Sequence, residues 1–228
     1  YVMLELGQPL HAFDKAKISG GLTIKRAGKS QPFTTLDGQV RQLGADDLMV
    51  WDDKQPLALA GTMGGQSSEI SETTTEIALE AVRFDPVCVA RNSRRHKLSS
   101  EASRRLERSV DPSLAEFASA RFVQLLTSHS SAKHVATVKD GQPRFTPVIT
   151  LDPTYIPRLL GFEIAWSEIA RNLRIIGCDV DEKTHQVDPP AWRSDLLTPS
   201  DLAEEVARMI GYDKIPSILP PRPKHASL

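Results

Sequence analysis

The chain has 228 residues, with 28 Lys and Arg against 29 Asp and Glu, and a formal net charge of −1. This length suits one large or two modest domains, and the balanced charge argues against a protein that binds nucleic acid over its whole surface. A local basic patch is still compatible with it. Two cysteines, Cys88 and Cys178, form neither a disulfide framework nor a zinc spacing, so we expect a reducing, cytoplasmic setting. The chain opens at Tyr1 in what reads as the middle of an element, so we expect a fragment of a larger protein.

Residues 1–84 are expected to form mainly strands and turns. Short apolar runs predict strands at residues 22–25, 33–36, 39–43, 48–51, 56–60 and 77–84. The Asp37-Gly38 pair between the second and third of these predicts a hairpin, because both residues tolerate the turn conformation. Residues 7–14, which contain Pro9 and His11, are expected to be irregular.

The rest of the chain is predicted to be more helical. Helices are expected at residues 87–96, from about 101, and at 112–126, before a polar stretch that marks a domain boundary. A second domain then shows two short helices (153–160 and 167–176), a two-stranded wing and a last helix. We therefore predict an α/β (α+β) fold with three parts: a mixed-sheet domain at 1–143, a winged-helix-like domain at 146–216, and a Pro-rich linker at 217–228.

The last predicted helix carries a group of acidic residues. Thr198 fits its N-cap, Pro199 its first position, and Asp201 completes a capping-box pattern. Asp201, Glu204 and Glu205 have i, i+3, i+4 spacing, which places them on one helix face, and Asp195 precedes them in the loop. Oxygen-only ligands suit Mg2+. A solvated acidic face with Arg208 as the partner of Glu204, or favourable placement at the helix N-terminus, explains the same pattern.

Glu80 is the sharpest candidate in the first domain. On a strand at 77–84 it shares a face with Ala78 and Val82, while apolar residues occupy the other face. If both faces are covered, the carboxylate must find donors or change its pKa. An internal salt bridge to a downstream arginine is one reading, and a hydrogen-bond acceptor at the floor of a pocket is the other.

Three further segments contain candidate residues. His11 is a lone histidine, which is often structural. Residues 60–65 form a Gly-rich turn around Gly64 that lacks the Lys-Ser/Thr of a phosphate loop, so nucleotide binding there is rejected. Ser100, in the basic segment 94–108, suits the N-cap of the following helix. The basic residues around it form either a solvated face or contacts to phosphates.

Several long motifs resemble the bacterial phenylalanyl-tRNA synthetase beta subunit, in order and over nearly the whole chain. They are residues 4–14, 57–65, 104–112, 189–195 and 204–216. The resemblance implies most of an editing (tRNA-binding) domain, truncated at its N-terminus, followed by a winged-helix-like module. In some positions the chain departs from the family pattern: Ser100 stands where Thr is usual, Ser99 where His is common, and Lys97 and Ser109 where Gly is frequent.

The resemblance also implies residue roles in hydrolysing tyrosine wrongly attached to the phenylalanine tRNA. Glu80 and the backbone at Gly64 would read the tyrosine hydroxyl. His11 and Ser100 would lie near the ester and the attacking water, and Ala102 would shape the pocket wall. A scaffold with no editing activity is the alternative. A free-standing nucleic-acid-binding winged helix is disfavoured, because the most distinctive helix of the second domain is acidic.

In the second module the resemblance implies a magnesium site shared with an alpha subunit. Its predicted ligands are Asp195, Asp201, Glu204 and Glu205, which we expect to lie close enough to share a cation. The whole enzyme would be an aminoacyl-tRNA ligase of two alpha and two beta subunits that uses ATP, phenylalanine and tRNA. This piece could carry at most the editing hydrolysis.

Overall fold

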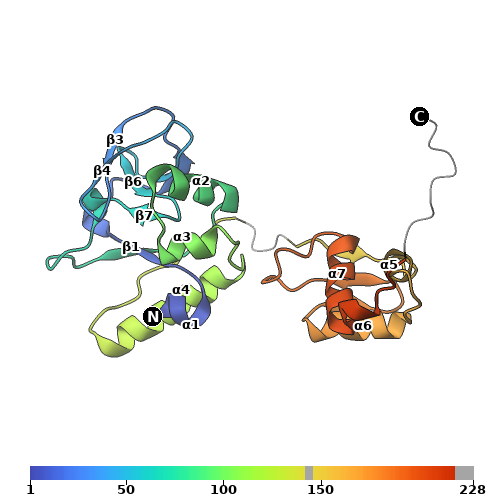
Figure 1. The fold of residues 1–228 in the computed structure, drawn as a ribbon. Helices are drawn as coiled ribbons and strands as arrows, with labels where there is room; N and C mark the ends of the chain where they lie inside the picture. Colours follow the sequence, from blue (N-terminus) through green and yellow to red (C-terminus); the bar gives the residue numbers. More distant parts are fainter. Residues whose placement is uncertain (142–145, 219–228) are drawn as a thin grey trace, which may run out of the picture. The chain divides into compact units, whose positions relative to one another are not determined.

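The computed structural model describes residues 1–141 and 146–218, and the chain divides into two compact units. Unit 1 spans Tyr1–Arg144 and unit 2 spans Phe145–Leu228. Each combines helices with small antiparallel sheets, which confirms the α+β class (Figure 1). Most of the predicted Pro-rich linker, residues 219–228, lies outside the described residues.

Unit 1 is built on three antiparallel sheets. The largest has the strand order β2–β5–β6–β7, formed by Thr23–Arg26, Leu48–Trp51, Pro56–Leu59 and Met63–Gly64. The second is the predicted hairpin, in which β3 (Pro32–Thr34) pairs with β4 (Val40–Gln42). The third is a two-stranded ribbon of β1 (His11–Asp14) and β8 (Ile77–Glu80), whose strands are far apart in sequence.

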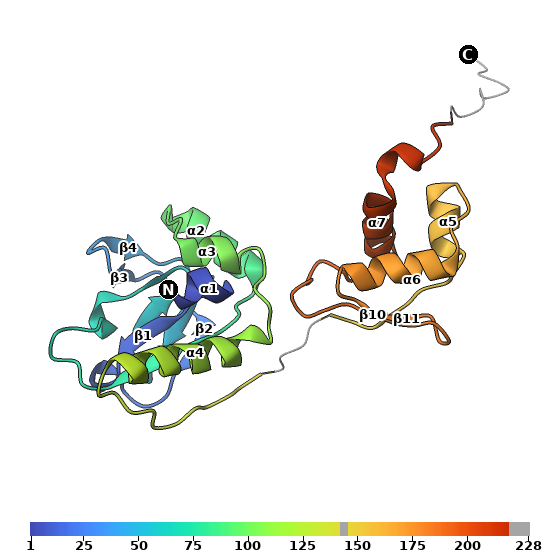
Figure 2. The ribbon, with the colours of Figure 1, turned by 90° about the horizontal axis from the view of Figure 1, so that it is seen from below.

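Within residues 1–141, four α-helices and two short 3-10 helices complete unit 1. The α-helices are α1 (Val2–Leu6), α2 (Pro86–His96), α3 (Glu101–Leu106) and α4 (Leu114–His129), and the 3-10 helices are η1 (Lys15–Lys17) and η2 (Gln66–Ser68). Asp85 caps α2, because its side chain accepts a hydrogen bond from the Cys88 N–H. The two views in Figures 1 and 2 show how α1, α3 and α4 lie around the β1–β8 ribbon.

Apolar side chains of unit 1 form two buried clusters. One lies between the large sheet, the ribbon and the helices, and its members are Phe13, Val50, Leu57, Ala58, Ala60, Phe84, Val89, Leu106 and Val110. The other lies under the hairpin and contains Ala27, Phe33, Leu43, Met49, Leu59 and Leu98. Together they fix α2, α3 and the connection between them against the strands.

Unit 2 has the predicted winged-helix-like arrangement of three helices and a small antiparallel sheet. The helices are α5 (Tyr155–Leu160), α6 (Trp166–Ile175) and α7 (Pro199–Ile210), and η3 (Tyr212–Lys214) follows. The sheet has the order β10–β11–β9, formed by Asp179–Asp181, Gln186–Asp188 and Ile149–Thr150. A separate core packs these elements, with Leu151, Ile156, Ile169, Leu173, Val187 and Leu202 fully or almost fully buried.

Two predictions about the site-bearing segments need correction. His11 does not lie in an irregular stretch but in β1, because Pro9 precedes the strand instead of interrupting it. The strand predicted at 77–84 ends at Glu80, because the pairing with β1 ends there. Beyond that point the Gln8 amide donates to the Val82 carbonyl at 3.0 Å in place of a strand partner.

Two turns adopt a backbone conformation that favours glycine. Lys97 has φ 54° at the end of α2, and Ser109 has φ 69° after α3. These are the two positions at which the family resemblance led us to expect glycine. Among the described residues, no helix is both long and apolar enough to cross a membrane.

Candidate functional site

His11 and Glu80 face each other across the β1–β8 ribbon. Their Cα atoms are register partners in this antiparallel pair, so both side chains project from the same face. Phe13, two residues along β1, shares that face, and its ring meets the His11 imidazole edge-on with 4.4 Å between the centroids. The ribbon therefore places the His11 imidazole beside the Glu80 carboxylate, with the Phe13 ring packed against the imidazole.

Gly64, at the end of β7, lies against the His11 ring. A Cβ atom at this position would lie 2.5 Å from His11 Cε1 and 2.8 Å from Nε2, so any larger residue would collide with the imidazole. The Gly64 carbonyl accepts a hydrogen bond from the Leu36 N–H at 3.0 Å. The large sheet and the ribbon thus meet where His11 contacts a glycine backbone.

The Glu80 carboxylate has no hydrogen-bond donor recorded among residues 1–141 and 146–218. Its Oε2 is buried and has no hydrogen-bond partner among the residues that the structure describes, and no ion pair to Glu80 is found there either. Burial raises its pKa from the ordinary 4.5 to about 7. The internal salt bridge considered from the sequence is therefore not formed within the described chain, and Glu80 titrates near neutrality instead.

Burial shifts the pKa of His11 in the opposite direction from that of Glu80. It lowers the pKa of the imidazole, because a buried cation is disfavoured. His11 is therefore neutral at physiological pH and has one ring nitrogen able to accept a proton or a hydrogen bond. A neutral imidazole beside a carboxyl group that titrates near 7 can accept, donate and pass protons without a metal or a covalent nucleophile.

Ser100 occupies the N-cap of α3, as one sequence interpretation expected. Its Oγ accepts from the Ser103 N–H at 3.0 Å, and the Ser103 hydroxyl completes a capping box with the Ser100 backbone. The same Oγ donates to the Thr62 carbonyl at 2.9 Å, which ties α3 to the segment that leads into Gly64. The Ser100 proton is therefore engaged by the Thr62 carbonyl, and the predicted place of Ser100 near the ester stays a prediction.

The surroundings of Ala102 do not show whether it lines a pocket. It lies in the first turn of α3, two residues after Ser100, and is half-buried. Its assignment to the pocket wall stays a prediction. His11, Glu80 and Gly64 are thus brought together directly, and Ser100 is joined to the same part of the fold through Thr62.

The predicted magnesium ligands in unit 2 are arranged differently. Arg193 Nη2 lies 2.6 Å from an Asp195 oxygen and 2.8 Å from a Glu205 oxygen, so one guanidinium bridges both carboxylates. Arg208 pairs with Glu205 and not with Glu204, which corrects the pairing expected from the sequence. The Arg193 hydrogen bonds lower the pKa of Asp195 and of Glu205.

Asp201 is also engaged within the chain. Burial raises its pKa, but donors from Leu197 and Thr198 lower it more, and the net shift is downward. Its Oδ2 accepts from the Thr198 N–H at 2.7 Å in the predicted capping box. Glu204 is exposed.

Within the described residues, no three His, Cys, Asp or Glu side chains are placed to hold a metal ion. The expected close approach of the four acids is therefore not found. Their oxygens suit Mg2+ in kind, but as arranged here they do not fit an ion, because Arg193 occupies the space between two of them. The sequence interpretation missed Arg193, whose position two residues before Asp195 was the available signal.

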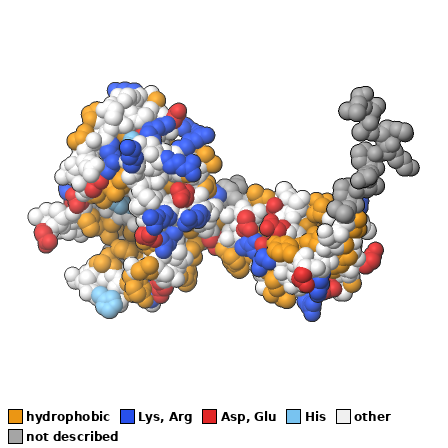
Figure 3. Space-filling model, in the orientation of Figure 1, with side chains coloured by type: hydrophobic (Ala, Val, Ile, Leu, Met, Phe, Trp, Pro, Cys, Tyr) orange, Lys and Arg blue, Asp and Glu red, His pale blue; other side chains and the backbone are white. Residues whose placement is uncertain are grey.

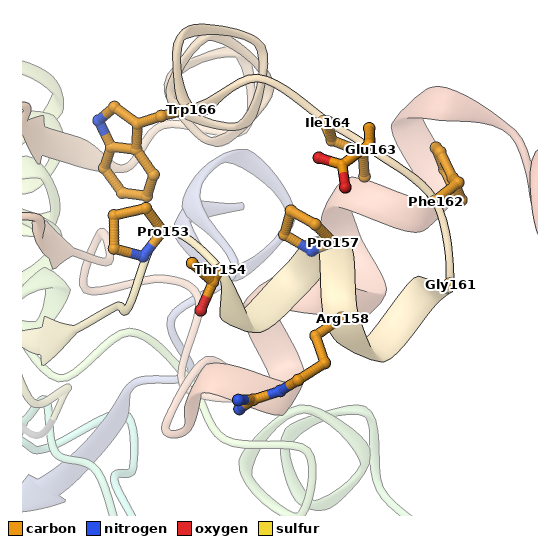
Figure 4. A pocket seen from close by; sticks show the side chains of 9 residues that line it. All are labelled: Pro153, Thr154, Pro157, Arg158, Gly161, Phe162, Glu163, Ile164 and Trp166. Atoms are coloured by element: carbon orange, nitrogen blue, oxygen red, sulfur yellow. The ribbon is translucent and has the colours of Figure 1, made fainter.

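A groove of about 650 Å³ lies on the α5 side of unit 2 (Figure 4). The residues that line it are Pro153, Thr154, Pro157, Arg158, Gly161, Phe162, Glu163, Ile164 and Trp166. None of the predicted site residues belongs to this set, so the groove does not contribute to either candidate site.

Known families match both units. A sequence model of the B3/4 domain matches residues 1–131, and one of the tRNA synthetase B5 domain matches residues 149–212. Together these domains define the class as a subunit of an aminoacyl-tRNA ligase.

Relatives refine this class. The chain is 46% identical over 228 residues to the phenylalanine–tRNA ligase beta subunit of Streptomyces avermitilis and 48% identical over 227 residues to that of Leifsonia xyli subsp. xyli. The chain belongs to the phenylalanine–tRNA ligase beta subunit family. In both comparisons 98% of this chain is covered but 27% of the relative, so the chain spans about a quarter of their length.

A solved structure also resembles the chain. It is the crystal structure of an N-terminal fragment of the phenylalanyl-tRNA synthetase beta subunit from Pyrococcus horikoshii. The match covers 93% of this chain and 63% of that one, with a TM-score of 0.44 and 15% identity.

Proposed function

We propose that unit 1 is an editing domain that hydrolyses the ester of tyrosine wrongly attached to the phenylalanine tRNA. The observation that carries the proposal is the Glu80 carboxylate beside a neutral His11, because its buried Oε2 has no donor in the part of the chain that the structure describes. A phenolic hydroxyl would supply the missing donor. Phenylalanine would leave the carboxylate without one, and sites that hydrogen-bond a substrate hydroxyl reject the analogue that lacks it by about 10⁴-fold or more.

The residues around Glu80 suit the rest of this reaction. An aminoacyl ester is already reactive, so holding a water near its carbonyl is most of the task. The free ring nitrogen of His11 can accept a proton from that water. Ser100 holds the start of α3 through Thr62, and Gly64 leaves room for the imidazole, so both would act by position.

Replacement of Glu80 by alanine in the assembled enzyme tests the proposal. We expect phenylalanylation to be unaffected and hydrolysis of tyrosyl-tRNA to slow about 10- to 100-fold, the value of a hydrogen bond to a charged group. Glu76→Ala is the matched control, because Glu76 is exposed just before β8. Deacylation kinetics on mischarged tRNA give the answer. An unchanged rate for Glu80→Ala overturns Glu80 as the reader of the tyrosine hydroxyl. A wild-type rate no faster than spontaneous hydrolysis of the ester favours the alternative of a scaffold without editing activity.

We also propose that the whole protein, acting in the cytoplasm with an alpha subunit, ligates phenylalanine to tRNA with ATP. The family resemblance assigns Asp195, Asp201, Glu204 and Glu205 to a magnesium site shared with that subunit. Because Arg193 bridges Asp195 and Glu205 in the described chain, such a site would need a different arrangement of these side chains in the assembled enzyme. The oxygen-only donor set around α7 supports the magnesium assignment.

The test of the magnesium proposal is subunit association. We expect Asp201→Ala combined with Glu204→Ala to weaken alpha–beta assembly and its sensitivity to a chelator, while the chain itself stays folded. If mutant and wild type assemble equally, with no chelator effect on either, capping and ion pairing are the full role of these acids.

A further inference from the structure

Positive charge is concentrated in the segment that contains α2 and α3. Residues 83–108 hold eight of the 28 Lys and Arg but three of the 29 Asp and Glu, although the chain has a net charge of −1. Figure 3 shows Lys and Arg side chains gathered over the part of unit 1 where α2 and α3 lie in Figure 1. Charge of one sign on one face is the footprint expected of a surface that binds a polyanion.

Some of these cations are already neutralised inside the chain. Arg95 pairs with the buried Asp47, and Arg104 and Arg105 share the single carboxylate of Glu101. Four other cations are exposed and have no ion pair among residues 1–141 and 146–218. These four residues, which we call the basic face, are Arg91, Arg94, Lys97 and Arg108.

The basic face flanks the candidate site on both sides of one short connection. Arg91 and Arg94 lie one turn apart on α2, Lys97 ends that helix, and Arg108 follows α3. Between Lys97 and α3 stands Ser100, whose hydroxyl reaches Thr62. The cations are therefore attached to the same helices that position the candidate site.

The connection between α2 and α3 is held to the strands of unit 1 by buried contacts. His96 is buried, with Nε2 2.6 Å from an Asp47 oxygen, and its carbonyl accepts from Arg41 at 2.9 Å. Leu98 is buried in the cluster under the hairpin. A fixed backbone keeps the spacing between the cations constant, as repeated phosphate contacts require.

We propose that the basic face binds backbone phosphates of the tRNA strand whose end carries the ester, and guides that end to His11 and Glu80. This inference rests on the proposed editing function. Phosphate contacts by Lys and Arg fix the position of a nucleic acid without reading its sequence, which suits a site that must accept the strand end whatever amino acid it carries.

The experiment measures binding of a fluorescein-labelled phenylalanine tRNA transcript that carries no amino acid. Anisotropy titrations with the 228-residue chain are run from about 50 to about 200 mM salt. The test variant changes Arg91, Arg94, Lys97 and Arg108 to Gln. The control variant removes the same number of charges outside residues 83–108, by changing Lys15, Lys29, Lys54 and Lys133 to Gln; all four are exposed.

We expect the test variant to bind at least about tenfold more weakly at low salt, and its salt slope to fall by about 3, since each lost phosphate contact on a single strand removes about 0.7. The control variant should retain the wild-type slope. Equal weakening of both variants, or none in either, overturns the basic face as a specific surface. Because the probe carries no ester, this binding result is independent of the hydrolysis assay on Glu80→Ala. If Glu80→Ala loses hydrolysis while the test variant binds the tRNA normally, the editing function is kept and the basic face is rejected.

Discussion

Glu80 in unit 1 and Glu205 in unit 2 are glutamates with little exposed carboxylate surface, but their surroundings differ. Glu205 is 13% exposed and is held by Arg193 and Arg208, which lower its pKa. Glu80 has no donor among the described residues, and burial raises its pKa to about 7. A carboxylate with internal partners is explained by the chain itself. One without them leaves a hydrogen-bonding position for a ligand to fill.

The largest expected effect is in unit 2, where the acids depend on one arginine. Arg193→Met should lower the free energy of unfolding of unit 2 by about 3 kcal/mol, because it removes charged hydrogen bonds to Asp195 and to Glu205, which is 13% exposed. Urea unfolding followed by unit 2 resonances measures this, with Arg171→Met, which removes a more exposed arginine, as the control.

The pH dependence of Arg193→Met gives a second check. Paired carboxylates with lowered pKa values stabilise the fold above their unfolded pKa values, and this contribution is lost as pH falls through the folded ones. The difference in the free energy of unfolding between wild type and Arg193→Met should therefore shrink in acid. If Arg193→Met destabilises unit 2 equally at low pH, Arg193 contributes through packing and not through its charge.

The opposite sign is expected at Glu80. Its pKa is higher in the folded state than the ordinary 4.5, so the folded state retains the proton longer, and stability falls as pH rises from about 4.5 to about 7. Glu80→Gln removes this penalty and should stabilise the chain by up to about 3 kcal/mol near pH 8, since a pKa difference of one is worth about 1.4 kcal/mol. Near pH 4.5 the gain should nearly vanish. Thermal unfolding at both pH values checks it, and a gain independent of pH would show that Glu80 does not titrate in this range.

The smallest effect distinguishes capping from charge at α7. Asp201→Ala should cost about 1 kcal/mol, because it removes the acceptor of the Thr198 N–H. Glu204→Ala, on the same face, should change stability by less than about 0.5 kcal/mol, because Glu204 is exposed. Equal costs from circular-dichroism melts would mean that shared charge, and not the cap, sets the stability here.

Local features were accessible from the sequence. The capping box of Thr198 and Asp201 and the cap at Ser100 depend on residues three apart, and both were predicted. The hairpin at Asp37-Gly38 was predicted for the same reason. Such contacts form within one turn, so residue type and spacing suffice to define them.

The contacts that build the candidate site were not accessible in this way. The pairing of β1 with β8 joins His11 to Glu80 across most of unit 1, and the contact of His11 with Gly64 depends on how two sheets meet. The bridge from Arg193 to Glu205 is similar, because these residues are 12 positions apart and no helix spacing joins them. Family resemblance named His11, Glu80 and Gly64, but only the fold shows which of them touch.

The separation of the hydrophobic cores has a consequence for synthesis of the chain. Both buried clusters of unit 1 are complete by Val110, whereas the core of unit 2 begins at Ile149. The ribosome delivers the N-terminal part first, and domains generally fold as units. Unit 1 therefore has all the apolar partners of its two clusters before translation reaches unit 2, and a nascent chain stalled between the two cores should already resist protease across β1 to α3.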